Sequence, residues 1–328
     1  MKKKMKFTLL LSLFTIWAQA QEVSKNEKKE TCFKIAELIK SNYVIKEKGD
    51  EIAEAFIKFY RAGRFDFAMN WHQLDSVMTK SLREISNDGH LYTWHNPEIV
   101  KQLKNEKKEF KENGEEVRSF FNNEKAFSSN FGFKKIEIMA GNVGYLEISQ
   151  INISIESLRT LYAAMEFIKN TRALIIDLRG NRGGGSTVGP VLESFFFQKE
   201  TDLLEFKNRN GITEMSKTVT WLLEEKYNRP LYILINNETA SAAEAFAFAL
   251  KHQARAILVG EPSAGGAFMN KYFLINDQLV LAVSTNAPFL PGTQLTWEGT
   301  GVVPDITVYG HEAKEKALAL INEKLDKE

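Results

Sequence analysis

The sequence has a single cysteine among 328 residues, at position 32, and this scarcity excludes two kinds of structural support. One cysteine cannot close a disulfide within the chain, and it cannot build a zinc site from several thiolates. An excess of charge is also missing, because 43 Lys and Arg residues offset 42 Asp and Glu residues. A net charge of +1 provides no basic field for DNA or RNA, so we expect no nucleic-acid partner. With 44% hydrophobic residues, the chain can fold on its core alone.

Long hydrophobic runs are scarce as well, and the one notable run lies at the N-terminus. Residues 1–20 combine four lysines, an apolar stretch over residues 7–17 and Ala-Gln-Ala at 18–20. This order is typical of a secretory signal peptide with its cleavage site, and the stretch is shorter than the roughly 20 residues of a spanning helix. We therefore predict export to the periplasm or outside the cell, with no membrane span after cleavage. A retained anchor is the alternative.

The first part of the remaining chain has a helical pattern. Over residues 21–100, apolar side chains recur three and four positions apart, as in Leu74, Met78 and Leu82. This spacing predicts a small N-terminal domain of about three helices. Residues 101–135 begin with a stretch rich in lysine and glutamate, which we interpret as a charged connector.

From residue 136 the pattern changes to short apolar runs between amphipathic segments. Such runs are typical of parallel strands buried on both faces, with helices in the crossover connections. The expected strands are 143–148, 173–178, 231–235 and 256–259, the expected helices 155–168, 188–197, 240–252 and 312–325, and a hairpin is expected over 273–284. We therefore predict an α/β domain over residues 136–328.

Two turns at the ends of these strands are candidates for chemistry. Ser241 stands between the strand 231–235 and the helix that follows, where helix amides could stabilise an oxyanion. An N-cap serine with no chemical role explains the same residue. The second turn contains Gly183, Gly184 and Gly185, which allow a ligand to approach the backbone. The turn fits neither nucleotide-binding motif, so we expect no nucleotide, other cofactor or metal.

Two further segments contain side chains that could take part. Asn87-Asp88-Gly89-His90-Leu91 closes the helical region, and Trp297 to Asp305 forms a loop that includes Glu298. Taken singly, His90 could be a surface histidine and Glu298 a solvated loop carboxylate.

Taken together, the motifs resemble a known family. Asp-Leu-Arg-Gly-Asn at 177–181 is followed by Thr-Ala-Ser-Ala-x-Glu at 239–244, Gly-Glu-Pro at 260–262 and Glu-Gly-x-Gly-Val-x-Pro-Asp at 298–305. In this order and spacing, residues 141–308 are similar to the C-terminal processing, or tail-specific, serine peptidases. The resemblance implies a crotonase-like or ClpP-like α/β core. It also implies an enzyme that hydrolyses peptides or unfolded protein tails.

The resemblance also selects between two arrangements of the family's site. The processing proteases use a lysine in a Gly-Lys-Gly turn and carry a PDZ module. Here that turn is Gly265-Gly266-Ala267, Lys271 is a poor substitute, and residues 95–134 are too few for such a module. Tricorn-type proteases use Ser, His and Glu, and the N-terminal segment also looks like the modules of interphotoreceptor retinoid-binding protein. This arrangement implies that the catalytic residues are Ser241, His90 and Glu298.

Each of these residues receives a role from the tricorn-like arrangement. His90 accepts the proton of Ser241, and Glu298 orients His90 or holds a water molecule. The Ala242 amide and an amide of Gly183 or Gly184 form the oxyanion hole. Two other functions stay open on the same scaffold: a non-catalytic module that binds a lipid or other apolar ligand, and a hydrolase of small esters. The sequence indicates neither the substrate sequence nor the oligomeric state.

Overall fold

The computed structural model describes residues 22–112, 124–211 and 213–325. The predicted signal peptide, residues 1–20, lies outside the described residues, as does part of the predicted connector. Residues 22–86 form the three helices expected from the apolar spacing: α1 (Lys25–Asn42), α2 (Lys46–Arg61) and α3 (Trp71–Ser86). Leu74, Met78 and Leu82 are fully buried between them.

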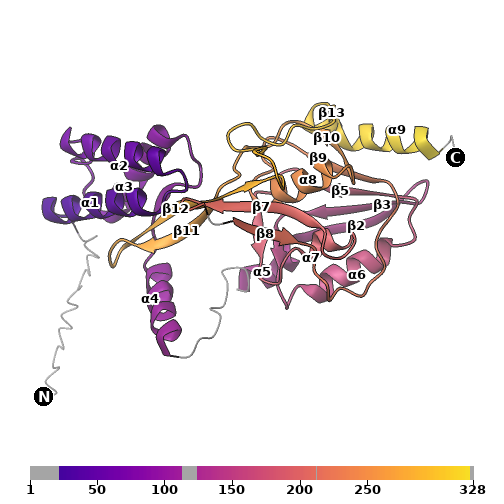
Figure 1. The fold of residues 1–328 in the computed structure, drawn as a ribbon, viewed down its shortest axis with the longest axis horizontal. Coiled ribbons are helices and arrows are strands. Elements are labelled where there is room, and N and C mark those ends of the chain that lie inside the picture. The colour runs from indigo at the N-terminus through magenta and orange to yellow at the C-terminus, as the bar shows by residue number, and fades with distance from the viewer. Residues whose placement is uncertain (1–21, 113–123, 212, 326–328) are drawn as a thin grey trace, which may run out of the picture.

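A six-stranded sheet forms the core of the second half of the chain (Figure 1). Its order is β13-β10-β9-β5-β3-β2, and all neighbours are parallel except the β2–β3 pair at one edge. The predicted parallel α/β core is confirmed. The strands are β2 (Phe133–Met139), β3 (Val143–Ile148), β5 (Ala173–Asp177), β9 (Leu231–Ile235), β10 (Ile257–Gly260) and β13 (Ile306–Thr307).

Helices cover both faces of this sheet, which explains why its central strands are apolar throughout. Ile176 and Ile233 pack on the face covered by α6 (Leu158–Ile168) and α8 (Ala242–His252). Ile175 and Leu234 point the other way, towards α9 (Ala313–Leu325). Because successive strand residues face opposite sides, both sets must be hydrophobic.

The helix expected over 188–197 is much shorter in the structure. Only α7 (Val191–Ser194) is helical there. Gly189 has φ +79° and Pro190 precedes the first turn, so the helix cannot begin earlier. At its end, the Phe195 amide donates to the Leu192 carbonyl, three residues back, which tightens and closes the last turn.

A second sheet connects the two halves of the chain. Its order is β1-β12-β7-β8, with β11 also paired to β12. The β11–β12 hairpin matches the one predicted, whereas β1, β7 and β8 were not predicted. Figure 1 shows the hairpin reaching from the α/β core to the N-terminal helices. The strands are β1 (Tyr92–His95), β7 (Asp202–Asn208), β8 (Thr213–Lys217), β11 (Met269–Leu274) and β12 (Leu279–Phe289).

The hairpin shares a hydrophobic core with the helices. Leu279, Leu281 and Val283 of β12 pack in the cluster that contains Leu74 and Leu82. The loop between α3 and β1 is therefore held between the helices and the hairpin. The remaining elements are α4 (Pro97–Glu112), α5 (Glu124–Ser128), β4 (Ile151–Ile153), β6 (Gly184–Ser186) and two short 3-10 helices, η1 (Asn130–Gly132) and η2 (Gly310–Glu312). Among the helices described, none is long and apolar enough to cross a bilayer.

Candidate active site

Ser241 lies at the turn from β9 into α8, as predicted, and its backbone is strained. Its φ is +54° and its ψ is −122°, a conformation that residues with a Cβ rarely adopt. Two hydrogen bonds hold the turn: the Ala240 amide donates to the Asn181 carbonyl (2.9 Å), and the Ser241 amide donates to Glu244 Oε2 (2.7 Å). Such strain persists where the surroundings determine the conformation, and it is typical of functional sites.

Glu244 is a fully buried carboxylate that connects this turn to a second one. Besides the Ser241 amide, it accepts hydrogen bonds from Ser263 Oγ (2.5 Å), the Gly265 amide (2.7 Å) and the Gly266 amide (3.0 Å). A buried charge needs such donors, because burial removes its hydration. The sequence motif contained Glu244, but no role was predicted for it. An acid three residues after an N-cap serine, the capping-box pattern, is the signal that could have indicated its contact with the Ser241 amide.

The glycine-rich loop approaches Ser241 closely at Gly183. A Cβ placed on Gly183 would lie 2.7 Å from Ser241 Cβ and 2.8 Å from the Ala240 carbonyl oxygen. The Gly183 amide donates to Asn181 Oδ1 at 2.9 Å. Its predicted use in the oxyanion hole would require that bond to break. Ala242 opens α8, so its amide has no carbonyl partner one turn earlier in the helix.

Replacement of Gly183 by alanine is expected to destabilise the protein by about 1–3 kcal/mol, because the methyl group displaces the Ser241 turn. Gly211→Ala is the matched control. Gly211 also has a positive φ (+73°), but a Cβ there meets nothing within 4 Å. Urea unfolding of both variants separates the effect of crowding from that of backbone strain. Equal losses in the two variants would show that close packing at Gly183 is unimportant.

His90, from the N-terminal half of the chain, packs against the Gly266 turn. Its Cε1 lies 2.8 Å, and its Nδ1 3.6 Å, from the position of a Cβ on Gly266. The Gly266 amide is bonded to Glu244, which in turn holds the Ser241 amide. The half-buried imidazole therefore packs against the turn that is tied to Ser241. The sequence analysis did not predict this contact between His90 and the Gly266 turn; the family resemblance implied only that His90 and Ser241 belong to one site.

The surroundings of His90 favour its neutral form. Burial lowers the pKa of His90, and the negative charges of Asp88 and Glu244 oppose this in part, whereas the Arg83 guanidinium adds to it. The Nδ1 atom is buried and has no hydrogen-bond partner among the residues described. A neutral imidazole is the form that can accept a proton.

Glu298 lies beside the same turn but contacts its backbone. Its Oε2 accepts hydrogen bonds from the Ala267 amide (2.8 Å) and the Phe268 amide (3.1 Å). Burial raises the pKa of Glu298, and the nearby Asp88 charge acts in the same direction. The observed partners of Glu298 therefore hold the turn against which His90 packs.

The other sequence candidates lie in structural positions. Arg179 donates to Asp177 and to the Gly310 carbonyl (2.6 Å), which braces the loop. Lys271 lies within β11, opposite Val283 of β12. Among the described residues, no group of three or more His, Cys, Asp or Glu side chains could hold a metal ion.

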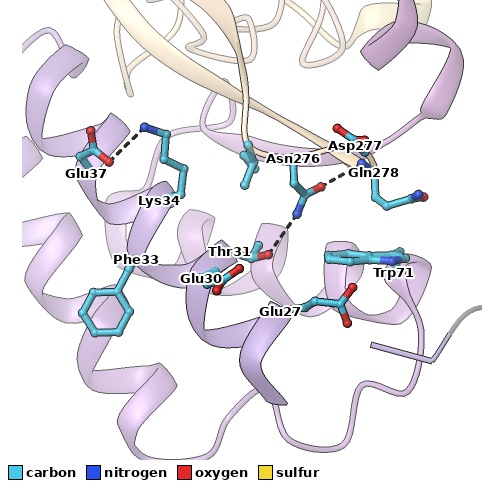
Figure 2. A pocket seen from close by; sticks show the side chains of 11 residues that line it. Glu27, Glu30, Thr31, Phe33, Lys34, Glu37, Trp71, Asn276, Asp277 and Gln278 are labelled. Atoms are coloured by element: carbon cyan, nitrogen blue, oxygen red, sulfur yellow. Dashed lines mark hydrogen bonds and ion pairs between the residues drawn. The ribbon is translucent and has the colours of Figure 1, made fainter. Parts of the chain in front are cut away.

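A large cavity lies elsewhere, beside the N-terminal helices. It has a volume of about 1020 Å³ between α1, Trp71 and the turn of the β11–β12 hairpin (Figure 2). Two polar contacts join residues that line it: Asn276 Nδ2 donates a hydrogen bond to Thr31 Oγ1 (3.1 Å), and Lys34 forms an ion pair with Glu37. None of Ser241, His90 and Glu298 lines it.

Comparison with known proteins places the chain in a family. The profile of peptidase family S41 matches residues 142–308, just over half of the chain. The profile of the N-terminal domain of Peptidase_S41 in eukaryotic IRBP matches residues 18–131. A carboxyl-terminal-processing protease of Picosynechococcus is 31% identical over 174 residues, which are 51% of this chain and 39% of that protein. The present chain thus matches well under half of that relative's length.

Solved structures agree on the fold. A putative peptidase from Parabacteroides merdae aligns over 90% of this chain and 96% of its own, with a TM-score of 0.58 and 17% identity. The tricorn protease aligns over 92% of this chain and 37% of its own, with a TM-score of 0.56 and 16% identity. At these identities the likeness concerns the fold. The family follows from the profile that covers the Gly183 loop, the Ser241 turn and the Glu298 loop, and the chain belongs to peptidase family S41.

Proposed function

We propose that this protein is a serine peptidase that hydrolyses peptide bonds in peptides or unfolded protein tails, with Ser241, His90 and Glu298 at its site. The observation that carries the proposal is the strained Ser241 at the start of α8, with His90 packed against the Gly266 turn that Glu244 ties to it. A module that only binds ligand has no need for a serine with a strained backbone and a half-buried imidazole on two turns that Glu244 joins. The family membership supports the same reaction.

In the proposed reaction, His90 removes the proton of Ser241 Oγ as the oxygen attacks the substrate carbonyl. The tetrahedral intermediate then collapses: the C–N bond breaks, His90 returns the proton to the leaving amine, and an acyl-enzyme ester remains. Water, deprotonated by the same imidazole, attacks the ester carbonyl; the bond to Ser241 Oγ then breaks, and the imidazolium returns its proton to that oxygen. Glu298 supports this cycle by holding the Ala267 and Phe268 amides, which keeps the turn beside His90 in place.

The oxyanion of the intermediate needs donors close to Ser241. The Ala242 amide, the first of α8, is one such donor. The positive end of the helix dipole strengthens its interaction with the negatively charged oxygen. Gly184, the first residue of β6, is our choice for the second donor, because the Gly183 amide is engaged with Asn181. In other enzymes one such donor contributes about 3–4 kcal/mol to stabilising the transition state.

Export is part of the proposal and rests on residues 1–20. Their lysines, apolar run and Ala-Gln-Ala have the order of a signal peptide. The substrates would then be proteins of the cell envelope or its surroundings.

A fluorophosphonate probe tests the proposed function. We expect the probe to phosphonylate the wild-type protein at Ser241, because only an activated hydroxyl beside a base attacks it at a useful rate. Peptide mapping by mass spectrometry locates the label, and heat-denatured protein is the control for non-specific reaction. Cleavage of an unfolded protein should accompany labelling. If the folded protein is unlabelled and cleaves neither peptides nor small esters, a non-catalytic ligand-binding module is the correct alternative.

A further inference from the structure

Asp88 is a buried carboxylate two residues before His90, and it accepts hydrogen bonds both from its own loop and from distant parts of the chain. The residue is 1% exposed. Its Oδ1 accepts the backbone amide of His90 at 2.8 Å. Its Oδ2 accepts the hydroxyls of Tyr43 (3.0 Å) and Ser284 (2.7 Å). Both carboxylate oxygens are thus used, one for the histidine and one for anchors outside the loop.

The two hydroxyl groups come from different parts of the molecule. Tyr43 is the C-cap residue of α1, and Ser284 lies in β12. The Tyr43 ring also packs edge-on against Phe268 (6.4 Å between centroids), whose amide donates to Glu298. Asp88 therefore links His90 to the N-terminal helices through Tyr43 and to the hairpin through Ser284. The Tyr43 ring in turn contacts the turn that Glu298 holds.

A neutral side chain could make similar hydrogen bonds without the cost of burying a charge. A charge at this position is useful if the neighbouring imidazole becomes positive during the reaction. The charged groups acting on His90 are Asp88 and Arg83 from its own segment and Glu244 from α8, while Glu298 of the facing loop is bonded to backbone amides. Of these, Asp88 and Glu244 are the two whose charges raise the pKa of His90.

We propose that Asp88 is a positioning residue for His90. It fixes the imidazole through the His90 amide, with Tyr43 and Ser284 as its anchors, and its charge stabilises the imidazolium. The contribution to turnover depends on the peptidase function proposed above. The effect on the titration of His90 does not depend on it.

The test is Asp88→Asn, with Asp75→Asn as the matched control. Asp75, in α3, makes the same kind of contacts with β1: its Oδ2 accepts a hydrogen bond from the His95 amide (3.0 Å) and its Oδ1 accepts one from Thr93 Oγ1 (2.6 Å). The midpoints of the five histidine side chains are measured by NMR between pH 4 and 9, and His90 is assigned from the spectrum of His90→Gln. We expect Asp88→Asn to move the His90 midpoint to lower pH and Asp75→Asn to leave it unchanged.

Kinetics supply the second measurement. Because the active base is neutral His90, the acid limb of kcat/KM should move to lower pH in Asp88→Asn, while the plateau of kcat falls about 10-fold with little change in KM. Ser284→Ala retains the charge but removes an anchor. It should lower kcat several-fold, also without a matching change in KM, and it provides a test should Asp88→Asn fail to fold.

The possible outcomes are distinct. An unchanged His90 midpoint and unchanged kcat in Asp88→Asn would overturn the proposal, as would an equal shift of His90 in Asp75→Asn. If Asp88→Asn does not fold, unchanged kcat in Ser284→Ala overturns it. If wild-type protein hydrolyses nothing, the peptidase function fails, but a shifted His90 midpoint still shows that the Asp88 charge acts on the imidazole.

Discussion

Replacement of Ser241 by alanine is expected to lower kcat by about 10⁵–10⁶-fold, the scale found when a serine peptidase loses its nucleophile. The hydroxyl supplies the atom that forms the acyl-enzyme, and no neighbouring group can replace it. The folded state should change little, because the bonds that hold the turn are made by the Ala240 and Ser241 backbone amides, which alanine retains. Turnover of a peptide substrate and thermal unfolding measure the two effects separately.

Two further variants make this result specific. Ser128→Ala removes a hydroxyl of helix α5 that bonds only to the Lys125 carbonyl among the contacts described. It should leave turnover unchanged. Ser241→Gly should be as inactive as Ser241→Ala but more stable by about 1 kcal/mol, because glycine accepts a φ of +54° without strain. Full activity in Ser241→Ala would identify a different nucleophile.

His90→Ala should have the second-largest effect, a loss of about 10⁴–10⁶-fold in kcat across the accessible pH range. Without the imidazole, Ser241 has no base within the arrangement proposed here. In the wild type, activity should fall on the acid side as His90 becomes protonated. Burial lowers the pKa of His90, so this fall should occur at a pH below the ordinary histidine value of about 6.5. The pH dependence of kcat/KM measures both the limb and its loss.

Two controls accompany this experiment. His95→Ala removes a histidine of β1 that contacts Gln278 (3.2 Å), and we expect it to retain the activity and the acid limb. Lys271→Met tests the lysine that the family resemblance ranked as a poor substitute for a base. Normal activity in His90→Ala together with a large loss in Lys271→Met would reverse the assignment and make this a serine–lysine site.

Much of the architecture was readable from local pattern. Ile175, Ile176, Ile233 and Leu234 lie in uninterrupted apolar runs, because the sheet is covered on both faces by α6, α8 and α9. The predicted helices of residues 22–86 are confirmed as well. They could be predicted because one side of each helix is apolar, which gives the spacing of three and four residues. The strands β7 and β8 were missed because their own residues are largely half-buried or exposed, so neither an apolar run nor a clean alternation appears in them.

The candidate site also contains residues that local sequence could predict and residues that depend on tertiary contacts. Ser241, the glycines near 183 and Glu244 lie in motifs whose local form, a strand ending at a tight turn, follows from neighbouring residues. The partnership of His90 with the Gly266 turn could not be predicted physically from spacing. It depends on how the α3–β1 loop is clamped by Asp88 to Tyr43 and Ser284.

The sequence alone determined the layered α/β core, the helical N-terminal region and the identity of the candidate side chains, because periodicity and turn chemistry act over a few neighbouring residues. Tertiary structure alone decided that Glu244 joins two turns and that Glu298 accepts hydrogen bonds from the backbone amides of Ala267 and Phe268. Those contacts join segments far apart in the chain, and their geometry is set only when the hairpin and the helices close into one common core.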